Sequence, residues 1–279
     1  MSARVLVCVA LLVVGCNGST GGGLVSFTAR VRGVDPGPGG GVEFDNGKGF
    51  HVQLTSARFH VGAVYLSLTK YASGSGEQPC IVPGIYAGQA VGGCNQNGQD
   101  CGVDFDLLSP ELVTLTDHAQ GTANGPFQAN IWLTGGDINA NEDATPILQA
   151  SGTATKDNVA MPFSATVTIG SNRVMPPSSV ATPGQHPICG RRIVVETLCL
   201  PGDMGPCSYP QFTLENGGSL ELRVDPSVFF ANVDFSLLTT PTNGVYAIAD
   251  SETGAGIQLF DDGVQSAAAY TLSFTTTAQ

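Results

Sequence analysis

The stretch FHVQLTSARFHV, residues 50–61, decides the fold class of this chain. Its apolar residues alternate with polar ones in two groups, which are Phe50, Val52 and Leu54, followed by Ala57, Phe59 and Val61. Alternation with a period of two predicts a strand with one buried face. The second group has the opposite parity, and no turn residue separates the groups. One extra residue in a strand has this effect, so the stretch predicts a β-bulge.

Other β-type runs recur along the chain, nearly all bounded by Gly, Pro, Asn or Asp. They cover residues 25–32, 62–69, 103–108, 127–134, 147–154, 161–169, 192–200, 220–224, 245–249, 257–260 and 269–274. About a dozen short strands without a long stretch of helical period predict an all-β fold, an antiparallel β-sandwich with little helix. Asp225-Pro226 is typical of an N-cap followed by Pro at the first helical position, and predicts one or two helical turns over residues 227–233.

The body of the chain, residues 24–279, is long enough for one large domain or two. Residues 121–135 and 152–170 share a pattern, G-T-A followed by P-F-x-A-x-[IV]-x-[LIV]. Two strands of one sheet that converge on the same alternation would explain this likeness. The alternative is a duplication that produced two similar halves packed face to face, with a division near residues 135–155.

The N-terminus carries a short apolar run, residues 5–14, preceded by Arg4. A transmembrane helix needs about 20 such residues, so the length fits the apolar region of a secretory signal peptide. The segment Leu12-Val13-Val14-Gly15-Cys16 resembles the lipobox of bacterial lipoproteins. This resemblance implies a signal peptide over residues 1–15 and a diacylated Cys16 as the new N-terminus. The alternative is an ordinary signal peptide in which the cysteine is a coincidence.

The residues after Cys16 fit a lipid anchor. Residues 16–23 are rich in Gly and small polar residues and predict a flexible tether. In the lipoprotein family an Asp after the acylated cysteine is the usual signal for retention in the inner membrane, and this chain has Asn17 there. The resemblance therefore implies a lipid-anchored protein of the bacterial cell envelope, in the outer membrane.

Composition narrows the choice of partner. The formal net charge is −12, and only 12% of the residues are charged. An acidic chain lacks the basic surface that nucleic acids and anionic membranes require, so neither is an expected partner. Contact with the membrane is expected through the N-terminal lipid alone. A structural role, or binding of a protein or glycan, is the expected function.

Six cysteines remain after the signal peptide and Cys16 are set aside: Cys80, Cys94, Cys101, Cys189, Cys199 and Cys207. An even number in an oxidising compartment predicts three disulfides among 15 possible pairings. Cys199 and Cys207 flank a Pro-Gly turn and are expected to pair. Among the first three, one local bridge and one longer bridge to Cys189 are expected. Structural zinc is disfavoured, because the spacings and the absence of nearby histidines do not match zinc sites.

The best candidate binding site in the sequence is the acidic stretch of residues 137–143. Its oxygen-bearing residues Asp137, Asn139, Asn141 and Asp143 resemble the start of a calcium loop, whose ligands come from alternate positions. The sixth position is Glu142 where the calcium loop has Gly, and the twelfth is Leu148 where it has Glu. A polar hairpin loop explains the same residues. No cofactor is therefore expected, with calcium as the alternative.

A further resemblance extends over residues 40–135. The motifs at residues 50–66 and 103–108 and the Phe-x-x-x-[IV]-x-Leu strand are similar to uncharacterised bacterial sandwich lipoproteins. They are also similar to periplasmic copper-handling proteins that partner methanobactin. That second resemblance implies a copper site with histidines near a tryptophan. Trp132 has no histidine in its own strand, and His118 is the nearest in sequence.

No catalytic motif is evident. Ser73-Gly74-Ser75-Gly76 does not have the spacing of a nucleophile elbow, and no helix is expected after it. The carboxylate pairs Asp104/Asp106 and Asp261/Asp262 fall in strand or turn contexts, and one sequence cannot place two of them across a cleft. His51 and His60 are expected to be surface histidines. We therefore expect a non-enzymatic protein, with a hydrolase as the least favoured alternative.

Overall fold

The structure is a computed structural model, and it describes residues 23–62, 64–67, 80–81, 89–91, 102–122, 128–133, 146–168, 188–189, 191–196, 213–239, 241–249 and 254–276. It contains 55% strand and 14% helix, which confirms the all-β class. Two sheets of mixed strand direction pack together in a sandwich-like arrangement. None of the helices among the described residues is long and apolar enough to cross a membrane.

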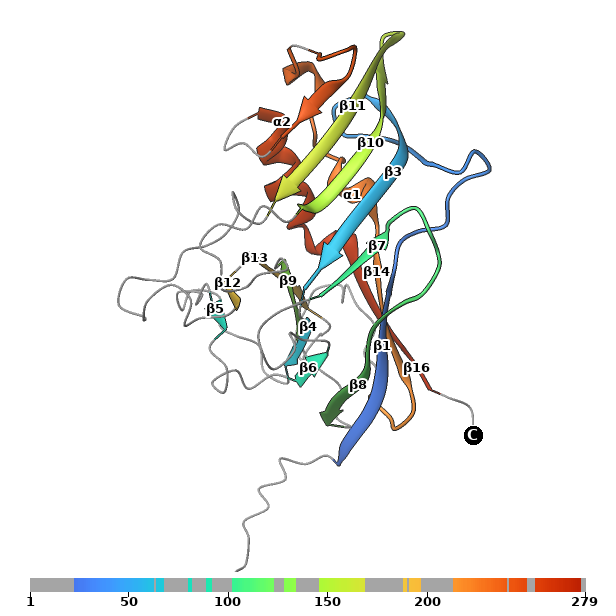
Figure 1. Cartoon of the computed structure of the whole chain (residues 1–279), viewed down its shortest axis with the longest axis vertical. Coiled ribbons are helices and arrows are strands. Elements are labelled where there is room, and N and C mark those ends of the chain that lie inside the picture. Colours follow the sequence, from blue (N-terminus) through green and yellow to red (C-terminus); the bar gives the residue numbers. More distant parts are fainter. Residues whose placement is uncertain are drawn as a thin grey trace, which may run out of the picture.

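The described strands form three larger sheets and one small sheet (Figure 1). Sheet A has the order β16-β14-β1-β8, with β1 Leu24–Arg32, β8 Val113–Thr122, β14 Ser219–Val224 and β16 Tyr270–Thr275. Sheet B has the order β15-β11-β10-β3-β2, with β2 Val42–Asp45, β3 His51–Val61, β10 Pro146–Lys156, β11 Val159–Thr168 and β15 Tyr246–Ile248, and β7 Val103–Asp106 also pairs with β3. Sheet C has the order β13-β9-β4-β6, with β4 Val64–Ser67, β6 Gln89–Val91, β9 Gln128–Leu133 and β13 Arg191–Glu196. The small sheet D pairs β5 Cys80–Ile81 with β12 Ile188–Cys189.

The sheets are not purely antiparallel, which corrects the sequence-based expectation. In sheet A the pair β1–β14 is parallel, and in sheet B the pair β11–β15 is parallel. Alternation of apolar residues determines which side of a strand is buried, but it carries no information about the direction of the neighbouring strand. The two segments with the shared pattern form β9 and β11. These strands lie in different sheets, so convergence within one sheet does not explain their likeness.

The helices are short and lie along one side of sheet B (Figure 1). They are α1 Pro226–Phe229, η2 Phe235–Leu237, α2 Gly254–Ile257, the π-helix η3 Gln258–Val264 and η4 Ala267–Ala269. The expected cap at the first helix is confirmed, because the Asp225 carboxylate accepts a hydrogen bond from the backbone of Ser227. The expected strand at residues 257–260 is wrong. A short apolar run does not distinguish a strand from a buried helix, and here Leu259 and Phe260 are buried within η3.

The predicted bulge lies at Thr55. In the pairing of β3 with β10, Ser56 lies opposite Ser151 and Leu54 lies opposite Gly152, so Thr55 is the extra residue. Ser56 and Thr55 are both exposed, and the buried parity switches beyond them, as the sequence predicted. The bulge also explains Gly152, because a Cβ at this position would lie 2.2 Å from the carbonyl oxygen of Gln53.

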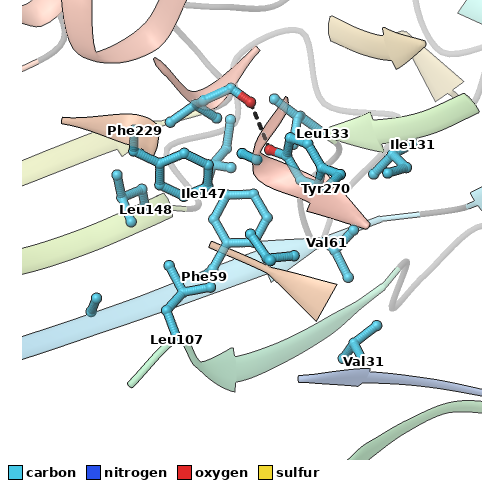
Figure 2. Close-up of a cluster of buried hydrophobic side chains, with 14 of the residues drawn as sticks. Val31, Phe59, Val61, Leu107, Ile131, Leu133, Ile147, Leu148, Phe229 and Tyr270 are labelled. Carbon is cyan, nitrogen blue, oxygen red and sulfur yellow. Dashed lines mark hydrogen bonds between the residues drawn. The ribbon is translucent and has the colours of Figure 1, made fainter. Parts of the chain in front are cut away.

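The buried side chains form one connected cluster that joins the sheets and the helices. Phe59 on β3 lies near its centre, with ring centroids 5.4 Å from Phe229 of α1 and 6.3 Å from Tyr270 of β16 (Figure 2). The Tyr270 hydroxyl donates a hydrogen bond of 2.6 Å to the carbonyl oxygen of Val264. Burial of one such aromatic ring contributes about 1.5 to 3 kcal/mol. Phe59 thus packs the inner face of sheet B into the core. The outer face of sheet B is exposed to solvent.

Candidate functional site

The outer face of sheet B carries a groove of about 730 Å³ among the described residues. Its floor is formed by β3, β10 and β11, and its wall by β7 and the segment that follows β7 to Val113. We call it the sheet-face groove. The polar side chains of its floor are on the opposite side of the strands from the aromatic core, because side chains alternate along each strand.

The middle of the floor is formed by small residues that carry hydroxyl groups. The register places Ser56, Ser151 and Ser164 side by side across β3, β10 and β11. The hydroxyl oxygens of Ser56 and Ser151 are 2.7 Å apart and share a hydrogen bond. Thr55, the bulged residue, also reaches this row, since its hydroxyl lies 3.3 Å from the carbonyl oxygen of Ser151. The bulge therefore brings two consecutive hydroxyl residues of β3 to the same face.

Longer polar side chains border this row. The next register positions place Asp106 of β7, Arg58 of β3, Gln149 of β10 and Thr166 of β11 across the sheet. All four are exposed and line the groove. Glu111, which is also exposed, lines the wall. The groove thus offers hydroxyl, amide, guanidinium and carboxylate groups within one concave surface.

Asp104 connects the groove to a buried histidine. One carboxylate oxygen of Asp104 accepts a hydrogen bond from the Arg58 guanidinium at 3.0 Å, and the other lies 2.8 Å from Nδ1 of His60. The His60 side chain is only 10% exposed, whereas that of Asp104 is 47% exposed. The expectation that His60 is a surface histidine is therefore wrong. Alternation after the bulge would expose His60 on the same face as Arg58, but His60 lies at the end of β3, where three successive residues are buried.

These contacts determine the charge on Asp104. Partial burial raises the pKa of the carboxyl, but the hydrogen bond from His60 and the positive charges of His60 and Arg58 outweigh it and lower the pKa below 3.8. A carboxyl held ionised in this way does not act as a general acid near neutral pH. Its oxygens are instead hydrogen-bond acceptors, which position Arg58 at the edge of the groove.

The groove suits a ligand that is bound through side chains. β10 is paired on both sides, and β3 and β11 are paired on their outer edges over part of their length, so the groove offers mainly side chains to a ligand. Phe105 is the one aromatic residue among the described lining residues, and it is only 4% exposed. Protein interfaces usually depend on exposed aromatic or aliphatic anchors. The described lining residues therefore offer polar side chains rather than an exposed aromatic anchor.

Several predicted site residues lie outside the described residues. These are Cys16, Asp137, Asn139, Asn141, Asp143, Cys94, Cys101, Cys199 and Cys207. Cys80 and Cys189 are described, and the register of β5 with β12 places them directly opposite each other. Among the described residues no three His, Cys, Asp or Glu residues gather in a group that could hold a metal ion. Of the residues considered for a copper site, His118 lies on β8 of sheet A and Trp132 lies on β9 of sheet C.

The sequence had marked Asp104 and Asp106 as a carboxylate pair, and the structure brings both to the groove. It had not marked the serine row, because Ser56 and Ser151 are 95 positions apart. The available signal was the Ser-Ala dipeptides at residues 56–57 and 164–165 and the Ala-Ser dipeptide at residues 150–151. In each of them a small polar residue faces outward and a small apolar residue faces inward.

Comparison with known proteins gave no match. No protein-family model fits the chain, and no curated protein or solved structure is significantly similar to it.

Proposed function

We propose that this chain is a lipid-anchored, non-enzymatic protein of a bacterial cell envelope that binds a glycan in the sheet-face groove. The presence of the sheet-face groove is the observation that supports binding of a ligand. Its hydroxyl, amide and carboxylate groups are the partners that sugar hydroxyls require, and its concave shape encloses a ligand from more than one side.

The anchor is supported by the sequence. The lipobox-like segment of residues 12–16 is followed by a Gly-rich tether, and Asn17 favours the outer membrane. Acyl chains contribute about 0.8 kcal/mol for each buried methylene group, so two or three chains hold a protein stably at a bilayer. Cys16→Ser is expected to abolish palmitate labelling and to release the protein from the membrane fraction. A variant that stays membrane-bound and unprocessed would show that residues 1–15 form an uncleaved anchor.

The proposal that the groove binds a glycan is tested with a variant that blocks the groove. Ser151→Arg places a long side chain at the centre of the serine row, where the wild-type residue is half-buried. Thr155→Arg is the matched control, because Thr155 lies four residues further along β10 on the same face, outside the groove lining. The probes are purified peptidoglycan sacculi and purified outer-membrane polysaccharide, and the measurement is the fraction of protein that co-sediments.

We expect Ser151→Arg to weaken binding by at least about tenfold, or about 1.4 kcal/mol, with no change for Thr155→Arg. Equal binding by the two variants, or no binding by the wild type to either probe, would refute the glycan proposal.

A metal-binding lipoprotein is the second candidate, and it rests on the acidic pattern of residues 137–143 alone. Calcium bound at residues 137–143 would support a different function from glycan binding in the groove. The calcium titration described in the Discussion separates the two candidates.

A further inference from the structure

The outer face of sheet A carries a cluster of arginines. On β1, Arg30 and Arg32 alternate with the buried residues Ala29 and Val31. The parallel neighbour β14 places Glu221 beside Arg30, and Arg223 beside Arg32. We call Arg30, Arg32 and Arg223 the arginine cluster.

Glu221 balances only part of this charge. The Arg32 guanidinium donates to the Glu221 carboxylate through Nε, with an N···O distance of 2.5 Å. At the paired positions of β1 and β14 three positive charges meet one negative charge, and the exposed Asp117 of β8, in the register shift beside Thr28, is the next carboxylate along β1. Arg32 and Arg223 are directly opposite each other, and like charges at such positions repel. A bound anion between them would relieve this repulsion.

The surroundings add no further carboxylate at the paired positions. Thr114 on β8 lies beside Arg30, and on β16 Ser273 lies beside Glu221 and Thr271 beside Arg223. Nε of Arg30 is buried and makes no hydrogen bond to any of the described residues. The cluster therefore has donors to spare in the middle of a hydroxyl-rich surface, and it stands out in a chain whose formal net charge is −12.

We propose that the arginine cluster binds the phosphate groups of anionic lipid headgroups, on the membrane that holds the lipid anchor. Guanidinium groups bind phosphate through two parallel hydrogen bonds. The overall acidity of the chain disfavours free polyanions such as nucleic acids, which its net charge repels. The lipid anchor holds the membrane close to the chain, so the arginine cluster contacts the headgroups in spite of the negative net charge of the chain.

The length of the tether fits this orientation, and this step rests on the proposed lipid anchor. Seven residues separate Cys16 from Leu24, the first residue of β1. The eight Cα–Cα steps from Cys16 to Leu24 span at most about 28 Å when fully extended. Leu24 is itself 66% exposed, although it is apolar. A tether of this length keeps the start of β1 near the bilayer, and Arg30 and Arg32 follow six and eight residues later on the same strand. The sheet-face groove, on a different sheet, remains open to the envelope.

The test uses the mature chain, residues 16–279, with Cys16→Ser, so that no acyl chain contributes to binding. All described elements begin after residue 22, so this chain contains each of them. Binding is measured by co-sedimentation with vesicles of 30% phosphatidylglycerol in phosphatidylcholine, and with vesicles of phosphatidylcholine alone, at about 0.1 M salt. The cluster variant is Arg30→Gln/Arg223→Gln. The control is Lys48→Gln/Lys156→Gln, which removes the same charge at the far end of sheet B.

Each basic residue near an anionic surface contributes about 1 kcal/mol, so loss of two weakens binding by about 30-fold. We expect the cluster variant to lose binding to anionic vesicles by about this factor, and the control to keep it. Equal binding of both variants, or equal binding to both kinds of vesicle, would overturn the proposal. A rise in melting temperature with inorganic phosphate, without vesicle binding, would also overturn it by showing a free-phosphate site. Because the protein is unlipidated, these results are independent of whether Cys16 is acylated.

Discussion

Replacement of Asn46 by alanine is expected to loosen the helical side of sheet B. Asn46 is only 7% exposed and lies in the turn between β2 and β3. Its side-chain amide donates hydrogen bonds to the carbonyl oxygens of Phe230 and Val233, at 3.3 and 2.8 Å. Its amide oxygen accepts from the backbone of Lys48 and of Phe50, each at 3.0 Å. One side chain thus connects a β-turn to the end of α1.

Alanine removes all four hydrogen bonds. A buried hydrogen bond contributes about 1 kcal/mol on balance, and a polar group left without a partner costs about 1 to 3 kcal/mol. We expect a loss of about 3 kcal/mol in the free energy of unfolding. For a chain of this size that loss lowers the melting temperature by roughly 6 to 12 °C. Urea unfolding and thermal melting, both followed by circular dichroism, measure the two quantities.

Asn216→Ala is the matched control, because Asn216 is exposed and accepts a single hydrogen bond from the backbone of Ser26, at 2.8 Å. It should cost less than about 1 kcal/mol. Asn46→Asp is a second probe. At neutral pH it places a carboxylate against the carbonyl oxygens of Phe230 and Val233, just after α1, so it should be at least as destabilising as Asn46→Ala. If Asn46→Ala costs no more than Asn216→Ala, the four hydrogen bonds do not hold the turn to α1.

Three further results are expected. Because its partners lower the pKa of Asp104 from its ordinary value, this carboxylate contributes stability that is present above the unfolded-state pKa and is lost as the pH falls through the lower folded-state pKa. The deficit of Asp104→Asn relative to the wild type should therefore be smaller at pH 3 than at pH 7, and urea unfolding at the two pH values tests this. Peptide mapping of the unreduced protein should find Cys80 linked to Cys189, since directly opposite strand positions lie within disulfide reach; separate thiols or other partners would contradict the register. Isothermal titration with calcium should give heat and raise the melting temperature if residues 137–143 form a calcium loop, and the absence of both would exclude it.

Alternation was the most informative signal in the sequence. It predicted β1, β3, β10, β11 and β16 and the bulge in β3, because each of these strands has one face in the core. The β8 strand was missed. Its pairing with β1 shifts register twice, between Phe27 and Ala29 and between Ala29 and Arg30, and its sequence becomes polar after Leu115. An irregular edge strand does not keep the period that sequence reasoning depends on.

The candidate sites were less predictable than the fold, for a physical reason. The serine row and the arginine cluster are both made by register, which brings together residues from strands that are distant in sequence. Net charge is a sum over the whole chain, so it argued against an anionic membrane and concealed the local excess at Arg30, Arg32 and Arg223. The cap at Asp225 was predictable because all of its determinants are local.

The bulge at Thr55 also has a consequence for how this chain tolerates insertions and deletions. A deletion within an interior strand normally turns every later side chain to the wrong face. Removal of Thr55 would have the opposite effect, because Leu54 would then be followed directly by Ser56, and every residue of β3 would keep its present side. Thr55 is thus a position in the middle of a sheet where the chain can change length by one residue without inverting the core. Families of related chains would be expected to differ in length there, with a straighter β3 in the shorter members.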